Sequence, residues 1–135
     1  MVAIGNLEIH MHILFADDQE FEHELLRSIL IRENHQIIHC KSGEELLDKL
    51  LGTTAFDVVI TDNDMGGGCM EGIDVLKILR ANERFASLPV IVRTAQTDLG
   101  FIQRVAALRG MYLYKSTRFS ESRYELLHAL SKIGR

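Results

Sequence analysis

The stretch Phe56-Asp57-Val58-Val59-Ile60-Thr61-Asp62-Asn63-Asp64-Met65 decides the fold of this chain. Its four consecutive β-branched residues, Val58–Thr61, end abruptly in an acidic, polar turn. An apolar run of this length, bounded by turn residues, is typical of a strand buried on both faces in the middle of a parallel sheet. Asp62 follows this strand directly, at the edge where open α/β sheets bind ligands. The pattern therefore places a carboxylate either at the mouth of a binding site or in a solvated loop.

The composition indicates one ordinary globular domain. The chain has 135 residues, 47% hydrophobic and 25% charged, and its 15 basic and 19 acidic residues give a net charge of −4. This balance argues against direct binding to nucleic acid. We find no apolar stretch of membrane-spanning length and no signal-peptide pattern, so no membrane contact is expected. Isolated Cys40 and Cys69 predict reduced thiols and a cytoplasmic location, and the six histidines lack the spacing of metal ligands.

Strands and helices alternate along the chain. Apolar runs predict strands at Met11–Ala16, Gln36–Cys40, Val58–Thr61, Leu88–Thr94 and Met111–Tyr114. Helical spacing of apolar residues predicts helices at 20–32, 42–52, 73–82, 97–108 and 120–133, with 66–68 as a glycine loop. Residues 1–10 form a short N-terminal extension of uncertain structure, and residues 11–135 form the domain.

Three local signals mark helix ends. Ser42 and Glu45 have the spacing of a capping box, in which each side chain bonds the other residue's backbone. Gly110 is the expected C-cap of the fourth helix, because glycine adopts the left-handed conformation found there. Ser120 is the expected N-cap of the last helix.

This alternation predicts an α/β fold. Helical crossovers between strands are right-handed and give a parallel sheet with helices on both faces. Five such units suit a flavodoxin-like (βα)5 three-layer sandwich with strand order 2-1-3-4-5. That order brings the carboxyl ends of four strands to one edge, and the residues expected there are Asp17, Asp18, Asp62, Thr94 and Lys115.

These five side chains are chemically coherent. Three crowded carboxylates repel one another, so at least one should have a raised pKa unless a cation joins them. Their hard oxygen ligands favour Mg²⁺, with Mn²⁺ as the alternative. Lys115 offers a positive charge for a phosphoryl group and Thr94 offers a hydroxyl. Together they are the parts needed to move a phosphoryl group onto an aspartate.

At this point the chain resembles the receiver domain of two-component response regulators, in the single-domain form of chemotaxis regulators. The resemblance covers residues 11–133. The motifs that carry it are Ile13-Leu14-Phe15-Ala16-Asp17-Asp18, Asp62-Asn63-Asp64-Met65, Glu71-Gly72, Val92-Arg93-Thr94-Ala95 and Tyr112-Leu113-Tyr114-Lys115. It implies a signalling switch rather than an enzyme in the usual sense, one that catalyses its own phosphorylation and dephosphorylation.

The resemblance also implies roles for the acidic residues. Asp62 is implied as the phosphoryl acceptor. Asp18, Asp62 and the backbone carbonyl of Asp64 would bind Mg²⁺ directly, while Asp17 would act mostly through water. Lys115 would hold the acceptor carboxylate and then the phosphoryl oxygens.

Further roles follow from the same resemblance. Thr94 and the backbone N–H of Ala95 would bind the phosphoryl group. Tyr112 would be the switch aromatic that moves inward when Thr94 shifts, although it could equally be a core residue. Asp64 and Gln96 would tune the rates. The implied partners are a histidine kinase or histidine phosphotransfer protein and an unknown downstream protein, bound through the fourth helix, fifth strand and fifth helix, a face that could also form a homodimer.

Two departures from the family pattern affect the loops. Gly66–Gly68 stands where the family usually has proline after the methionine, so we expect a more mobile loop. Ser116 follows Lys115 where the family usually has a cis proline. A cis bond before serine would cost about 3 kcal/mol, so we expect a trans bond and an altered loop.

Alternatives remain for the acceptor and for the function. Asp57 opens the strand at the wrong end and Asp64 lies two residues into the loop, which leaves Asp62 as the favoured acceptor. Cys69 is interpreted as an exposed bystander rather than a reactive thiol. Besides a stand-alone switch, the chain could be a phosphorylation-independent interaction module or the receiver part of a larger DNA-binding regulator.

Overall fold

The computed structural model describes residues 10–133, so nearly all of the expected extension 1–10 lies outside the described residues. The strands β1 (His12–Ala16), β2 (Gln36–Cys40), β3 (Val58–Thr61), β4 (Val90–Thr94) and β5 (Met111–Tyr114) form one parallel sheet. The strand order is β2-β1-β3-β4-β5, as predicted. Among the described residues, no helix combines the length and apolarity needed to cross a bilayer.

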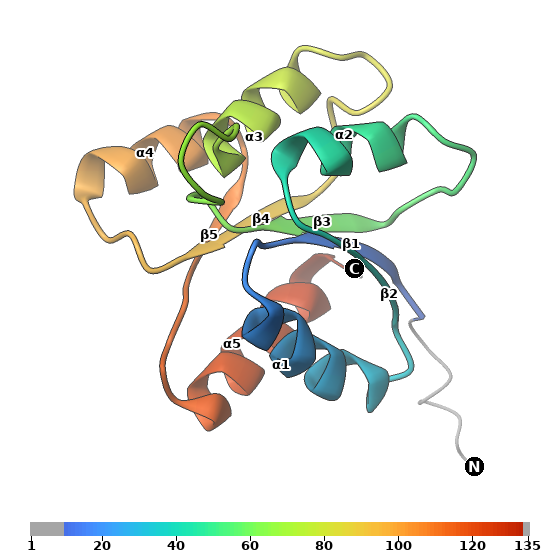
Figure 1. Ribbon diagram of the computed structural model, residues 1–135, viewed down its shortest axis with the longest axis vertical. Coiled ribbons are helices and arrows are strands. Elements are labelled where there is room, and N and C mark those ends of the chain that lie inside the picture. Colours follow the sequence, from blue (N-terminus) through green and yellow to red (C-terminus); the bar gives the residue numbers. More distant parts are fainter. Residues whose placement is uncertain (1–9, 134–135) are drawn as a thin grey trace.

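Helices cover both faces of the sheet and complete the three-layer sandwich (Figure 1). The layer with α2, α3 and α4 lies on one face, and α1 and α5 lie on the other. Their bounds are Glu20–Ile31 for α1, Gly43–Leu50 for α2, Gly72–Arg80 for α3, Leu99–Ala107 for α4 and Phe119–Ile133 for α5.

Each face of the sheet has its own hydrophobic core, because successive strand residues point to opposite faces. In β3 all four residues are buried: Val59 packs toward α2, α3 and α4, while Val58 and Ile60 pack toward α1 and α5. Full burial of one such side chain contributes roughly 1.5–3 kcal/mol. The strand predicted from the sequence to be central is therefore buried on both faces.

The register between the strands aligns the residues that directly follow β1 and β3, and those at the ends of β4 and β5. Ala16 in β1 pairs with Thr61 in β3, so Asp17 and Asp62 leave the sheet side by side. Thr94 in β4 pairs with Tyr114 in β5, and Lys115 follows directly. The acidic residues and Lys115 thus meet at the carboxyl edge, as expected.

Gly72 allows α3 to begin against the backbone of the central strand's exit. A Cβ atom at this position would collide with the carbonyl oxygen of Asp62 and come within 3.1 Å of Asn63 Cα. The Gly72 N–H donates to the Asn63 carbonyl at 2.9 Å. The Glu71-Gly72 turn therefore holds the segment after Asp62, and a larger residue would push it away.

The predicted helix ends need three corrections. Ser42 accepts from the Glu45 N–H, but the Glu45 carboxylate accepts from Lys41 N–H instead of closing a capping box with Ser42. The left-handed residue after α4 is Arg109, with φ of 60°, not Gly110. Gly110 is needed instead for space, because a Cβ there would lie 2.7 Å from Leu76 Cδ2. Ser120 lies inside α5, which begins at Phe119, and so it is not the N-cap.

Candidate functional site

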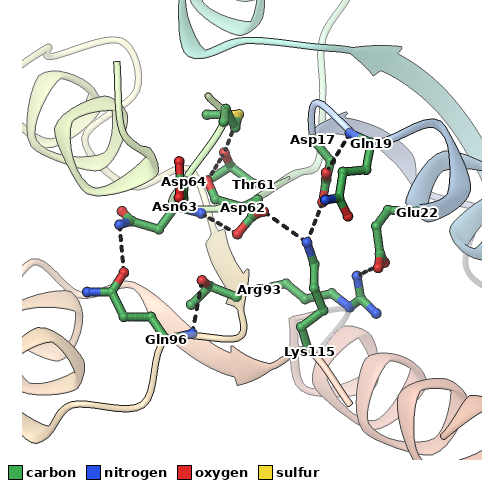
Figure 2. A network of polar contacts seen from close by, with 12 residues as sticks. Asp17, Gln19, Glu22, Thr61, Asp62, Asn63, Asp64, Arg93, Gln96 and Lys115 are labelled. Atoms are coloured by element: carbon green, nitrogen blue, oxygen red, sulfur yellow. Dashed lines mark hydrogen bonds and ion pairs between the residues drawn. The ribbon is translucent and has the colours of Figure 1, made fainter. Parts of the chain in front are cut away.

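Three carboxylates and one ammonium group form the centre of the site. Figure 2 shows the Lys115 ammonium between the carboxylates of Asp17 and Asp62. One carboxylate oxygen from each of Asp17, Asp18 and Asp62 lies within 4.8 Å of the other two. The Lys115 Nζ donates to Asp17 Oδ2 at 2.8 Å and to Asp62 Oδ2 at 2.9 Å. Asp17 and Asp62 are buried while Asp18 is exposed, so the cluster is open to solvent on the Asp18 side.

Burial dominates the electrostatics of this cluster. It raises the pKa of the Asp17 carboxyl, and the hydrogen bonds from Lys115 and the Gln19 N–H only partly oppose it. The charge on Asp62 adds a smaller effect, so burial outweighs the like-charge repulsion invoked from the sequence. Burial also acts to lower the pKa of the Lys115 ammonium, but its bonds to Asp17 and Asp62 outweigh burial and the pKa is raised. The Lys115 ammonium therefore stays charged between the carboxylates of Asp17 and Asp62.

Thr94, Ala95 and Gln96 line the β4 side of the site. Thr94 is buried at the end of β4, and its hydroxyl accepts from the Gln96 N–H at 3.3 Å. Ala95 is exposed and lines the same surface pocket as Lys115. All three of these residues were predicted, and the register of β4 beside β3 brings them to the edge that holds Asp62.

A chain of hydrogen bonds leads from Asp62 to Tyr112. The buried Asn63 donates its backbone N–H to Asp62 Oδ1 at 2.7 Å and its side-chain amide to Gln96 Oε1 at 3.0 Å. The Tyr112 hydroxyl donates to the Gln96 carbonyl at 2.6 Å, and its ring meets Phe101 edge-on. No role for Asn63 was predicted from the sequence, although its place directly after Asp62 was a usable signal.

The loop after β3 carries Asp64 and the glycine run. Asp64 is exposed, and its carboxylate accepts from the Gly66 N–H at 3.2 Å, so it braces its own turn. Gly66 and Gly68 have φ of 108° and 79°, values that only glycine adopts without strain. Cys69 is exposed, in agreement with its interpretation as a surface thiol, and Cys40 is buried. The peptide before Ser116 is trans, as predicted.

A buried ion pair connects β4 to α1, and it was not predicted from the sequence. Arg93 in β4 is only 1% exposed, and its Nη1 lies 2.6 Å from the carboxylate of Glu22 in α1 (Figure 2). Its Nη2 donates to the Ser122 hydroxyl in α5 at 3.5 Å. The signal was present, because a charged residue inside a buried strand needs a buried partner.

The fold also brings two distant histidines together. The Nδ1 atoms of His23 in α1 and His39 in β2 are 2.6 Å apart, and His23 Nε2 bonds the Asp17 carbonyl at 2.6 Å. Among residues 10–133, His39 Nε2 is the one buried side-chain polar atom without a hydrogen-bond partner. Their spacing in the sequence gave no hint of this contact.

The donor atoms of the acidic cluster fit a hard divalent cation. All three side chains offer carboxylate oxygens, and the exposed Asp18 leaves room for water ligands. Mg²⁺ prefers oxygen ligands and usually keeps several waters, which suits a cluster open on one side. Lys115 already neutralises part of the charge, so the cation would share Asp17 and Asp62 with it.

This geometry is that of a receiver, and comparison with known proteins agrees. Residues 13–123 match the family model of the response regulator receiver domain. The chain belongs to this family.

Its relatives and structural neighbours include chemotaxis proteins. The chain is 30% identical to chemotaxis protein CheY1 of Helicobacter pylori over 101 residues, which is 74% of this chain and 78% of the relative. It is 34% identical to chemotaxis protein CheY-3 of Vibrio cholerae, over 67% of this chain and 68% of the relative. The solved structure of response regulator TrrA from Thermotoga maritima, in complex with Mg²⁺-BeF, superposes with a TM-score of 0.74 and is 28% identical, covering 91% of this chain and 98% of that chain. Vibrio cholerae CheY4 superposes with a TM-score of 0.79 at 22% identity, covering 93% and 99%, and shares the fold.

Proposed function

We propose that this receiver domain is a phosphorylation-controlled switch whose phosphoryl acceptor is Asp62. The observation that carries the proposal is the meeting of Asp17, Asp18 and Asp62 within 4.8 Å, with the Lys115 ammonium bonded to two of them. The phosphodonor would be a histidine kinase or a histidine phosphotransfer protein. A cytoplasmic location, expected from the free thiols, belongs to the same proposal.

The proposed phosphoryl transfer needs a nucleophile and hydrogen-bond donors that bind the phosphoryl oxygens. A carboxylate oxygen of Asp62 attacks the phosphorus, and the bond from phosphorus to the donor breaks with its electron pair leaving on the donor. Lys115 lies where it can follow the phosphoryl oxygens, and the Thr94 hydroxyl and Ala95 N–H are the further donors on the β4 side. Attack by water on the same phosphorus returns the carboxylate and inorganic phosphate. The chain would thus catalyse its own phosphorylation and dephosphorylation without being an enzyme for another substrate.

Mg²⁺, or Mn²⁺ in its place, would be held by the side chains of Asp17, Asp18 and Asp62. The family resemblance adds the backbone carbonyl of Asp64 as a further ligand. When bound, the cation would neutralise the negative charge of the carboxylates and of the phosphoryl group. The TrrA structure, described in complex with Mg²⁺-BeF, supports this choice of ion. The proposed determinants of the rates are Asp64, which follows Asn63 in the chain, and Gln96, which accepts a hydrogen bond from the Asn63 side-chain amide.

The output surface proposed for this switch is α4, β5 and α5. Four large apolar side chains on these elements are exposed: Leu99, Tyr114, Phe119 and Tyr124. Tyr112 connects this face to Asp62 through Gln96 and Asn63, which supports a role as the switch aromatic. A downstream protein would bind there, and a homodimer is the second candidate occupant.

Intact-mass measurement after incubation with acetyl phosphate and Mg²⁺ tests the proposal. The protein should gain the mass of one phosphoryl group, and Asp62→Asn should gain none. A wild-type protein that stays unmodified would contradict the switch and favour a phosphorylation-independent interaction module. Transfer from a phosphorylated histidine phosphotransfer protein, followed by the same mass measurement, tests the class of donor.

A further inference from the structure

Lys115 occupies the first position after β5, and its side chain has to reach two carboxylates on other strands. Its backbone N–H donates to the Thr94 carbonyl at 2.9 Å, which holds the chain on the β4 side. From Ser116 onward the chain is a loop leading to α5 at Phe119. The direction in which Lys115 leaves the sheet therefore depends on what holds Ser116.

Ser122 in the first turns of α5 holds the Ser116 backbone. Its hydroxyl donates to the Ser116 carbonyl at 3.1 Å, and the residue is only 4% exposed. A serine inside a helix ordinarily donates to the carbonyl three or four residues earlier in the same helix. Ser122 instead donates six residues back, to a carbonyl outside the helix. This departure needs a group that orients the hydroxyl.

Arg93 is the group that orients the Ser122 hydroxyl. Its Nη2 donates to Ser122 Oγ at 3.5 Å, while its Nη1 is held by Glu22 at 2.6 Å. A hydroxyl has one hydrogen and two lone pairs. With a guanidinium N–H on a lone pair, the hydrogen turns toward the Ser116 carbonyl. The planar guanidinium fork can serve Glu22 and Ser122 together without bending.

Stability alone does not explain this arrangement. A buried ion pair loses hydration that its attraction often fails to recover, and apolar residues of similar volume are frequently as stable or more so. Arg93 and Glu22 are nevertheless both buried, and Glu22 lines the same surface pocket as Lys115 and Ser122. We propose that Arg93 and Ser122 are positioning residues for Lys115, acting through the Ser116 carbonyl. The inference rests on the proposed function, in which Lys115 contacts the phosphoryl group.

The first test removes only the Ser122 hydroxyl. Ser122→Ala should lower the rate of phosphorylation by acetyl phosphate about tenfold at saturating Mg²⁺ and phosphodonor, within the hundredfold that a misplacement of about 1 Å can cause. Its dissociation constant for Mg²⁺ should stay within about twofold of wild type, because the carboxylates do not move. Ser122→Thr keeps the hydroxyl and should recover most of the rate. Ser131→Ala is the matched control, since Ser131 donates to the His128 carbonyl within the same helix.

A second variant separates positioning from stability. The double replacement Arg93→Met with Glu22→Leu removes both charges together and should leave the midpoint of urea unfolding unchanged or raised. Its phosphorylation rate should still fall, because the Ser122 hydroxyl loses the Arg93 donor that orients it. A rate within twofold of wild type in both Ser122→Ala and this double variant would overturn the inference. A parallel loss of Mg²⁺ affinity and rate would also overturn it, since that result indicates a general structural role.

The Lys115 ammonium can also be observed without phosphorylation. Its hydrogen bonds to Asp17 and Asp62 should protect its Nζ protons from exchange, so that the ¹⁵N-labelled ammonium gives a resolved NMR signal in wild type. Ser122→Ala should broaden or lose this signal, and an unchanged signal would count against the inference. This measurement remains decisive if wild-type protein is not phosphorylated, an outcome that would refute the proposed function instead.

Discussion

Replacement of Lys115 by methionine removes the ammonium that joins two buried carboxylates. The distances of 2.8 and 2.9 Å correspond to roughly 6 kcal/mol of attraction for each pair at an effective dielectric constant of about 20. Most of this attraction is offset by the lost hydration of a side chain that exposes only 12% of its surface. We therefore expect Lys115→Met to lower the free energy of unfolding in EDTA by about 3 kcal/mol, the lower end of the range for a broken buried pair.

The same replacement should strengthen the binding of Mg²⁺, because a repelling charge is lost and the carboxylates are left uncompensated. A tenfold lower dissociation constant would raise the stabilisation from about 2.7 to about 4.1 kcal/mol at a Mg²⁺ concentration 100 times the wild-type constant. Part of the loss seen in EDTA would thus be recovered in Mg²⁺.

Urea unfolding in EDTA and in Mg²⁺, followed by circular dichroism, measures both effects. Lys41→Met is the matched control, because Lys41 is 68% exposed and its 3.6 Å pair with Glu20 should contribute less than about 1 kcal/mol. The reasoning is refuted if Lys115→Met is no less stable than Lys41→Met in EDTA, or if its Mg²⁺ affinity is equal to or weaker than that of wild type.

Three further predictions concern Asp62, Asp64 and His35. Asp62→Asn should not be phosphorylated and should gain about 1 kcal/mol of stability in EDTA, because three carboxylates share one ammonium; a lower urea midpoint would show that the lost ion pair outweighs the relief. Asp64→Asn should raise the phosphorylated fraction at fixed acetyl phosphate up to about fivefold, equivalent to about 1 kcal/mol of repulsion; unchanged phosphorylation and dephosphorylation rates would refute a tuning role. Burial lowers the pKa of His35, with His10 adding to the effect and Glu33 opposing it, so the folded protein resists protonation that the unfolded chain accepts. The stability that neutral His35 contributes should be fully present above a pH of about 6.5 and should decrease as the pH falls toward the lower pKa of the folded state. Between pH 7.5 and 5.5 the urea midpoint of His35→Gln should therefore fall less than that of wild type; equal falls would contradict this.

The alternation of apolar runs was sufficient to predict the sheet and its order. Val58–Thr61 could be assigned to the centre because no polar residue interrupts it, and every strand and helix that followed was recognisable from periodicity. Parallel crossovers have one handedness, so the alternation of strands and helices allows few sheet topologies. In each of them the acidic residues that follow the strands lie at the carboxyl edge of the sheet. Helix ends were less predictable, as Arg109 and Ser120 show, because local packing chooses between neighbouring cap positions.

Contacts between elements that are remote in the sequence were decided only by the tertiary structure. Arg93 and Glu22 are 71 residues apart, and Lys115 and Asp17 are 98 residues apart. Periodicity reports which face of an element is buried but not which side chain of another element lies opposite. The acidic edge could therefore be named from the sequence. The bonding of Lys115 to both Asp17 and Asp62, and the support of its loop by Ser122, depend on how α1, β4 and α5 pack together.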